Sequence, residues 1–193
     1  MVRGVSRENS SVPTVAGAES LMVDGFPVVL HPLGLACCAV EAAGGVAALA
    51  AASAAEAVAD PAIERHDLPA LHVLLVAGTV TRALAPEVST VWGNLPAPKV
   101  AVAFGACTIS GGPYWDSYAV APGLAGIVDA QVFVPGCPPA PAALVAGVQR
   151  AVREFAAGTA QQPRADIDGW TGKPDLHTRV AGGDHRSTSV DGH

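Results

Sequence analysis

The chain has 193 residues, half of them hydrophobic and 15% charged, which suffices for one domain with a buried core and excludes a mainly disordered protein. Its formal net charge of −6, without a basic stripe, argues against a general nucleic-acid binder. The longest apolar stretch, Ala42 to Ala55, is Ala-rich and shorter than the roughly 20 apolar residues that a membrane span needs.

The two ends of the chain differ in composition from its middle. Residues 1–23 show no periodicity and lack the apolar segment of a signal peptide. Residues 158–193 are poor in apolar residues, and their histidines are spaced too widely for a compact set of metal ligands. We therefore expect a flexible N-terminal segment (1–23), one α/β domain (24–157) and a flexible C-terminal tail (158–193).

Within the middle, helix-like and strand-like segments alternate along the chain. Ala39 to Ala59 is Ala-rich and favours a helix. Unbroken apolar runs, which are typical of strands buried on both faces, occur at residues 71–77, 100–104 and 132–134. Apolar spacing predicts helices over Val80–Trp92, capped by Thr79, and over Pro138–Phe155. This order predicts a parallel sheet with helices on both faces.

The four cysteines are Cys37, Cys38, Cys107 and Cys137. Cys107 and Cys137 follow predicted strands, whose carboxyl ends are where open α/β sheets bind ligands, and the tandem pair precedes the Ala-rich helix. We therefore expect all four thiols in one region. No Cys-x₂₋₄-Cys pair of a structural zinc site is present, and disulfides are not expected without a secretion signal. The spacing leaves two interpretations open: isolated buried cysteines, or four ligands of an iron–sulfur cluster.

Four segments of the chain carry a family resemblance. They are residues 34–41 (GLACCAVE), 76–86 (VAGTVTRALAP), 104–112 (FGACTISGG) and 134–139 (VPGCPP). In this order they closely resemble the cluster-bearing B subunit of respiratory complex I, the proton-pumping NADH:quinone oxidoreductase, over roughly residues 28–155. The resemblance implies a flavodoxin-like α/β domain that holds one [4Fe–4S] cluster.

The resemblance also implies what the chain does. In the family this cluster is the last in the electron pathway and reduces quinone, and its iron ligands fall here on Cys37, Cys38, Cys107 and Cys137. NADH and flavin bind other subunits, membrane subunits pump ions, and quinone binds where this chain meets a partner subunit. The chain would then be an electron-transfer subunit of the translocase, inactive alone, and peripheral on the cytoplasmic side of the cell membrane.

Two further residues match positions near the cluster and the quinone. Glu41, four residues after Cys37, matches the Glu of the family motif, and it would couple a proton to cluster reduction or hydrogen-bond a neighbouring backbone group. Arg65 falls on the first Arg of the family's Arg-x-Ser-Pro-Arg-Gln segment. Its cation would favour the reduced cluster or steady a quinone oxygen, unless it is a surface residue paired with Glu64 or Asp67.

The chain departs from the family pattern around the quinone. Ala42 and Ala43 stand where the family has two methionines that face the quinone cavity, and Pro69 replaces the second Arg. The run from His31 to Leu35 lacks the family's aromatic residues. We therefore expect an intact cluster site beside a rewritten quinone loop.

Two alternative functions remain open. The small subunit of a membrane-bound nickel–iron hydrogenase-type complex shares the tandem Cys pair, but it commonly has Gly-Pro-Val-Thr where this chain has Gly78-Thr-Val-Thr81, so Thr79 favours complex I. A cluster-binding scaffold or assembly factor without catalysis would fit the loss of the methionines and of the second Arg.

Overall fold

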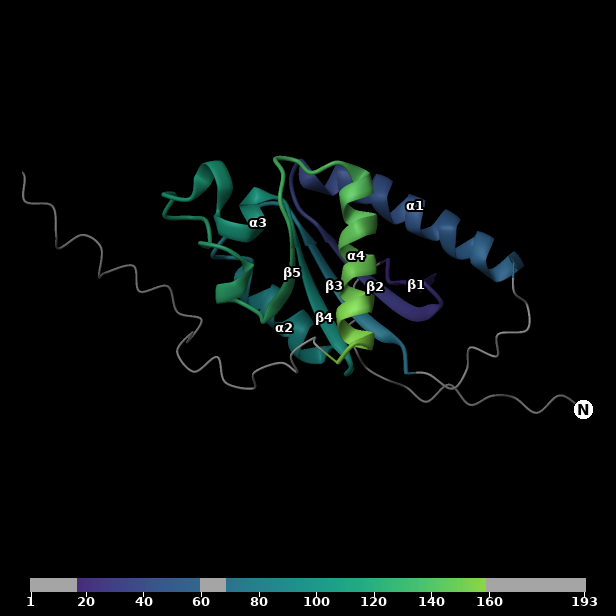
Figure 1. Cartoon of the computed structure of the whole chain (residues 1–193). Helices are drawn as coiled ribbons and strands as arrows, with labels where there is room; N and C mark the ends of the chain where they lie inside the picture. The colour runs from purple at the N-terminus through teal and green to yellow at the C-terminus, as the bar shows by residue number, and fades with distance from the viewer. Residues whose placement is uncertain (1–16, 60–68, 159–193) are drawn as a thin grey trace, which may run out of the picture.

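The computed structural model describes residues 17–59 and 69–158, which form one five-stranded sheet and four α-helices (Figure 1). The strands are β1 (Glu19–Val23), β2 (Phe26–Gly34), β3 (Leu71–Ala77), β4 (Lys99–Phe104) and β5 (Ala130–Val134). The helices are α1 (Cys38–Ala59), α2 (Ala85–Asn94), α3 (Ala106–Ser110) and α4 (Pro141–Ala156), with short 3₁₀ turns η1 (Gly112–Tyr114) and η2 (Leu124–Gly126). Of the tails expected at residues 1–23 and 158–193, residues 1–16 and 159–193 lie outside the described residues.

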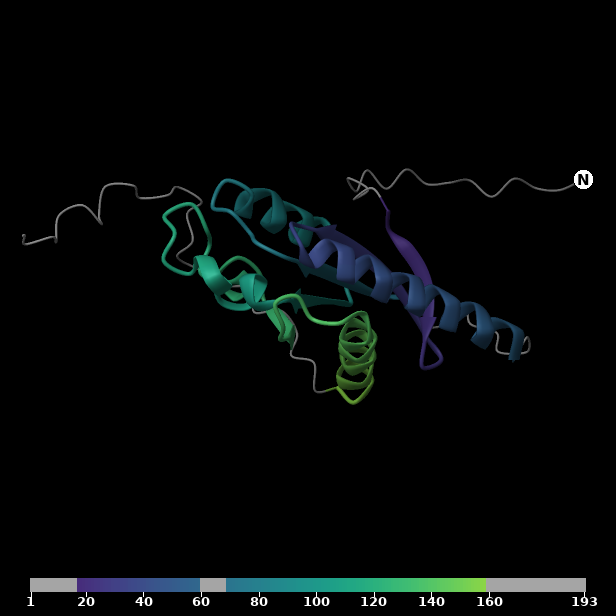
Figure 2. The ribbon, with the colours of Figure 1, turned by 90° about the horizontal axis from the view of Figure 1, so that it is seen from above.

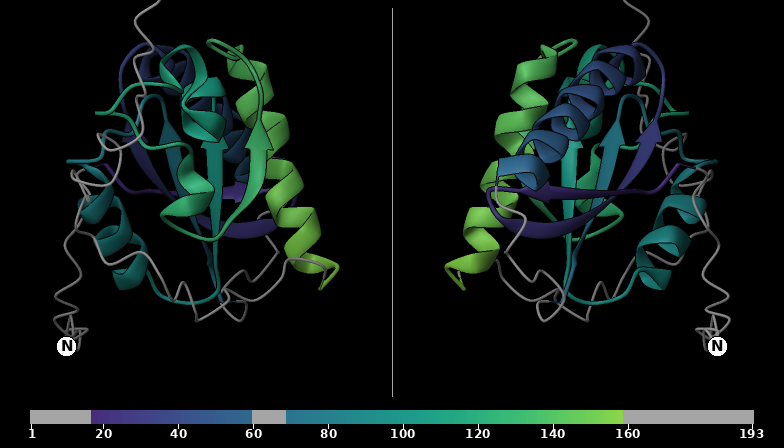
Figure 3. Two further views of the ribbon diagram at one scale, coloured as in Figure 1. Left: turned by 90° about the vertical axis from the view of Figure 1, so that its left-hand side faces the viewer. Right: turned by 90° about the vertical axis from the view of Figure 1, so that its right-hand side faces the viewer.

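The sheet is mostly parallel and has helices on both faces, as the sequence predicts. Strands β2 to β5 pair in parallel, and β1 pairs antiparallel with β2. One core lies between the sheet and helices α1 and α4, and the other lies between the sheet and α2 (Figure 2). Strand order follows the chain, β1-β2-β3-β4-β5, whereas flavodoxin itself has the order 2-1-3-4-5. The arrowheads of the parallel strands point to one edge, the carboxyl edge of the sheet (Figure 3).

The sheet begins with a hairpin that the apolar pattern did not predict. Asp24 and Gly25 join β1 to β2 with φ of 50° and 76°, the conformation of a tight hairpin turn that Asp-Gly favours. The side-chain amide of Gln149 in α4 donates a hydrogen bond to the Asp24 carboxylate at 2.9 Å, which links this turn to α4. Residues 19–23, assigned to the N-terminal segment from sequence, therefore form an edge strand of the sheet.

Helix α1 is longer than the apolar stretch within it, and it packs on the sheet and on α4. Its residues Cys38, Ala42, Val46 and Leu49 are buried in the core. By length and composition, Cys38–Glu56 is the one candidate membrane span among the described residues, with 28% of its residues buried. Gly45 lets α1 approach α4 closely, because a Cβ there would lie 2.7 Å from a methyl carbon of Leu144.

Helix α2 begins five residues later than the sequence predicts, and Thr79 does not cap it. Thr81 instead bridges to Val120, and its side-chain oxygen accepts a hydrogen bond from the Leu84 N–H at 3.2 Å. The helix follows at Ala85, with Pro86 in its first turn, where the missing N–H of a proline leaves no helical bond unmade. A tertiary bridge therefore overrides the local helix preference of residues 80–84.

Candidate metal centre

All four cysteines follow the ends of parallel strands at the carboxyl edge of the sheet. Cys37 and Cys38 come after β2, at the start of α1. Cys107 lies in α3, just after β4, and Cys137 follows β5 through Pro135 and Gly136. Because neighbouring parallel strands end at the same edge, the topology gathers thiols that are up to a hundred residues apart in sequence.

Backbone hydrogen bonds tie the Cys107 loop to the Cys137 loop. The Gly105 N–H donates to the Val134 oxygen at 2.9 Å, and the Ala106 N–H donates to the Gly136 oxygen at 2.7 Å. Both bonds continue the pairing of β4 with β5 beyond the ends of the strands. These two backbone hydrogen bonds therefore constrain the relative positions of the two cysteine loops.

Two glycines line the space around the buried thiols. A Cβ placed on Gly105 would lie 2.6 Å from the sulfur of Cys38, and a Cβ on Gly112 would lie 3.0 Å from the sulfur of Cys107. Any larger residue at Gly105 would therefore overlap the Cys38 thiol. Their bare backbone forms a cradle beside the sulfurs, as expected where a polypeptide must come close to an inorganic group.

The thiols form one electrostatic group, half buried and half exposed. Cys38 and Cys107 are buried, whereas Cys37 and Cys137 are exposed. Burial, and then the neighbouring Cys37, Cys107 and Cys137, which disfavour another negative charge, together raise the pKa of the Cys38 thiol to about 11. Four deprotonated thiols at this site would repel one another, so they require a strongly positive partner. Bound iron would supply that positive charge.

Four sulfur donors are the ligand type of an iron–sulfur cluster. Among residues 17–59 and 69–158, no three His, Cys, Asp or Glu side chains converge as ligands of one metal ion. A cluster has an iron at each of several corners, so its four thiolates stand farther apart than the ligands of one zinc ion. Soft sulfur donors beside bare glycine backbone are the ligands that such a cluster requires.

Of the other two candidate residues, Glu41 lies in the helix that begins at Cys38, and Arg65 lies outside the described residues. Glu41 lies half-buried in the first turn of α1, three residues after Cys38. Both of its expected roles, as a proton carrier or as a partner of the backbone, stay predictions. Arg65 falls within residues 60–68, outside the described part of the chain.

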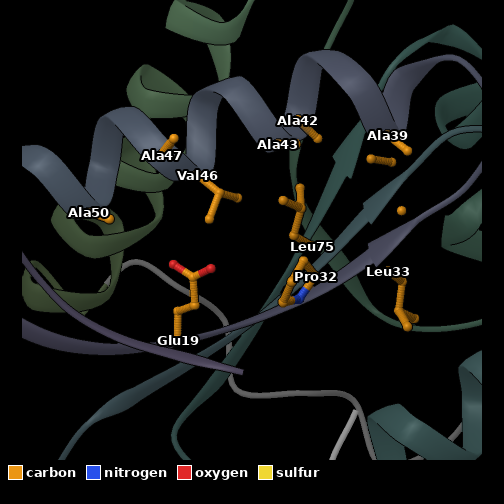
Figure 4. Close-up of a pocket in the computed structure, with 12 residues that line it drawn as sticks. Glu19, Pro32, Leu33, Ala39, Ala42, Ala43, Val46, Ala47, Ala50 and Leu75 are labelled. Atoms are coloured by element: carbon orange, nitrogen blue, oxygen red, sulfur yellow. The ribbon is translucent and has the colours of Figure 1, made fainter. Parts of the chain in front are cut away.

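A pocket of about 420 Å³ opens between α1 and the sheet edge at β2 (Figure 4). Its α1 wall consists of Ala39, Ala42, Ala43, Val46, Ala47 and Ala50. Pro32, Leu33 and Leu75 form the opposite wall, and the carboxylate of Glu19 points into the space. Both alanines that replace the family's methionines thus line an apolar pocket whose one end, at Ala39, adjoins Cys38.

Sequence reasoning missed two residues of this region. Glu19, in strand β1, is the one charged residue among the described residues that line the pocket. The missed signal is the Asp24-Gly25 pair, which lies between two apolar runs and is typical of a hairpin. Thr108, next to Cys107, is completely buried and hydrogen-bonded to the residue that follows β3, and no pattern in the sequence distinguishes it.

A histidine pair lies between β2 and β3. The His31 Nε2 and His72 Nδ1 atoms are 3.0 Å apart, and the rings stack with centroids 5.3 Å apart. Burial lowers the pKa of both histidines below the usual 6.5, and the neighbouring His72 lowers that of His31 further. The pair is therefore neutral near pH 7, with one ring nitrogen donating its N–H to the other.

We expect the free energy of unfolding to fall as the pH drops below about 6.5. Because both pKa values are lowered in the folded chain, the unfolded chain takes up protons first. This contribution is complete above pH 6.5 and is lost as the pH falls toward the folded-state values, by at most about 1.4 kcal/mol per histidine and pH unit. Urea unfolding at about pH 7.5 and about pH 5.5 measures it. His72→Gln should show a smaller loss, and an equal loss would contradict the assignment.

The fold and the four cysteines define the class of protein. It is an α/β domain with cysteine thiols at the carboxyl ends of its parallel strands. The chain belongs to the family described as NADH ubiquinone oxidoreductase, 20 Kd subunit, whose profile matches residues 36–151. All four cysteines lie inside the matched region. The family expected from the sequence motifs is thereby confirmed.

Individual relatives agree with the family. The chain is 37% identical over 136 residues to a B subunit of the NADH-quinone oxidoreductase of Salinispora tropica, covering 64% of each chain. It is 40% identical over 135 residues to a B subunit of the same enzyme of Streptomyces griseus, covering 64% of this chain and 51% of that one. The chain thus spans about half to two thirds of the length of these relatives. A solved archaeal membrane-bound sulfane sulfur reductase is 30% identical, with a TM-score of 0.44, covering 47% of this chain and 51% of that one.

Proposed function

We propose that this chain is the electron-transfer subunit that holds the last [4Fe–4S] cluster of a proton-pumping NADH:quinone oxidoreductase and passes electrons to quinone. The observation that carries the proposal is the meeting of all four cysteines at one edge of the sheet. Cys37, Cys38, Cys107 and Cys137 would hold the iron. When bound, the cluster supplies reversible one-electron transfer at a potential that burial and backbone donors tune.

The chain's own residues would do the positioning. Buried Cys38 and Cys107 keep water from one side of the site, while exposed Cys37 and Cys137 face the side open to a partner subunit. Glu41 stands three residues after Cys38, close enough in sequence to hold a proton near the thiolates. Arg65 stays proposed as the cation beside the quinone. Binding to other subunits would hold the chain at the cytoplasmic face of the cell membrane.

Metal analysis of the anaerobically purified complex tests the proposal. We expect about four irons and about four acid-labile sulfides per chain, together with a low-temperature EPR signal on reduction. Zinc without sulfide would rule out the cluster. A full cluster in a complex that never reduces quinone would favour the scaffold function, which is consistent with the alanines at the two methionine positions.

Quinone is proposed to use the pocket beside α1. Ala43→Met adds a long side chain at an exposed position of the pocket wall, so it should raise the KM for quinone by roughly tenfold without disturbing the core. Ala48→Met is the matched control, because Ala48 is also exposed on α1 but does not line the pocket. Steady-state quinone reduction by the assembled complex measures both. An unchanged KM for Ala43→Met would place the quinone elsewhere.

A further inference from the structure

Thr108, which follows Cys107 in α3, makes an unusual set of hydrogen bonds to the end of β3. Its side chain is fully buried. The Thr108 hydroxyl accepts a hydrogen bond from the Gly78 N–H at 2.9 Å and lies 2.6 Å from the Gly78 carbonyl oxygen, to which it donates. A second acceptor, the Phe104 oxygen, lies 3.0 Å away. One side chain thus satisfies both backbone groups of a glycine thirty residues away.

Gly78 in turn contacts the segment that carries the tandem cysteines. The Leu35 N–H donates to the Ala77 oxygen at 2.7 Å. The Leu35 oxygen lies so close to Gly78 that a Cβ on this residue would come within 1.7 Å of it. Leu35 stands two residues before Cys37. The end of β3, which bears no cysteine, therefore lies between the loop of the tandem pair and the loop of Cys107, and it contacts both.

We propose that Thr108 is a positioning residue, which fixes Cys107 relative to Cys37 and Cys38 through Gly78 and Leu35. That positioning would serve to bind the cluster of the proposed function, on which the inference rests, whereas its geometry comes from the described contacts. Backbone bonds tie the Cys137 loop to the Cys107 loop, but among the described residues no backbone bond ties the Cys107 loop to Gly78. The Thr108 hydroxyl supplies that link, and without it a buried N–H and a buried C=O lose their partners.

The test compares Thr108→Val, which keeps the shape and loses the hydroxyl, with Thr108→Ser, which keeps the hydroxyl. On the iron-free full chain, site-resolved thiol alkylation should show Cys107 reacting at least about tenfold faster in Thr108→Val than in wild type, because the loop opens locally. Exchange of the Gly78 amide hydrogen should accelerate in the same variant. In the loaded complex, the EPR signal of Thr108→Val should broaden or shift. Thr108→Ser should match wild type in all three measurements.

Ser53→Ala is the control for general loss of stability. The Ser53 hydroxyl accepts a hydrogen bond from the Met22 N–H at 2.7 Å, which joins α1 to β1 away from the cysteines. It should leave Cys107 alkylation and the EPR signal unchanged. The proposal is overturned if Thr108→Val behaves like wild type, if Thr108→Ser behaves like Thr108→Val, or if Ser53→Ala produces the same changes. If Thr108→Val does not fold, a Thr108→Ser chain that loses the wild-type protection of Gly78 and Cys107 overturns it.

The two proposals fail in distinguishable ways. A wild-type complex without iron and sulfide would end the proposed function, and the alkylation and exchange measurements on the full chain would still decide whether Thr108 holds the two loops together. A normal cluster with an unchanged spectrum and unchanged Cys107 reactivity in Thr108→Val would leave the proposed function standing and remove the positioning role.

Discussion

Replacing Cys107 with serine is expected to lower the iron and sulfide content of the assembled complex to less than about one tenth of the wild-type value, because an alkoxide is a poor ligand for iron–sulfur centres. Cys107 is 5% exposed, so the serine would leave a buried hydroxyl group at a site that has lost its cluster. Both changes should lower the melting temperature. Chemical iron and sulfide analysis, low-temperature EPR and circular dichroism during heating measure these effects.

Ser110→Ala is the matched control for Cys107→Ser. Ser110 ends the same short helix, is exposed, and its hydroxyl donates a long 3.4 Å hydrogen bond to the Ala106 oxygen. Its variant should keep the full iron content. Wild-type iron content in Cys107→Ser would show that Cys107 is not a ligand and would return the site to the interpretation of buried structural cysteines.

Adding one methyl group at Gly78 should be among the most destabilising small changes in the described part of the chain. Gly78 has φ of +122°, which residues other than glycine rarely adopt, and its Cβ would overlap the Leu35 carbonyl oxygen. Strain and overlap together should cost Gly78→Ala about 3 kcal/mol or more in the free energy of unfolding. For a chain of this length, that lowers the melting temperature by roughly 10 °C.

Gly93→Ala provides the contrast. Gly93 lies in α2, is exposed, and would have no atom within 4 Å of an added Cβ. Alanine there should be neutral or stabilise the chain by up to about 1 kcal/mol, since it favours the helix. Urea unfolding of the two variants beside wild type gives both values. A Gly78→Ala chain as stable as Gly93→Ala would contradict the close contact between β3 and the tandem-cysteine loop.

The strand that the sequence predicts best is β3. The run from Leu71 to Ala77 is unbroken and apolar, and the strand has the same bounds as the run because it is buried between two neighbours and two layers of helices. The spacing of apolar residues in α4 likewise predicted a helix, which begins three residues later than expected, at Pro141. Local apolar patterns therefore specified both elements, and only the start of α4 differed from the prediction.

Strand β2 could not be predicted in the same way, because Pro27 and Pro32 interrupt its sequence. Pro32 is tolerated there for a reason that only the sheet reveals. Strand β1 pairs with β2 only from Phe26 to Leu30, so Pro32 lies where one side of β2 is unpaired. Prolines are normally excluded from strands that are paired on both sides. At Pro32 one side of β2 is unpaired, so the missing N–H leaves no ladder hydrogen bond unmade on that side.

The sequence by itself determined the family, the α/β class and the identity of the candidate cluster ligands, because tandem cysteines, strand-end cysteines and unbroken apolar runs are local patterns. Only the tertiary structure decided which thiols are buried, that Ala43 lines a pocket with Glu19, and that Thr108 links Cys107 to β3. The physical reason is that burial and hydrogen bonding join residues far apart in the chain. Nothing in the local sequence distinguishes Thr108 or Gly78. The pairing of β3 with β4 brings the Thr108 hydroxyl within 3 Å of the Gly78 nitrogen.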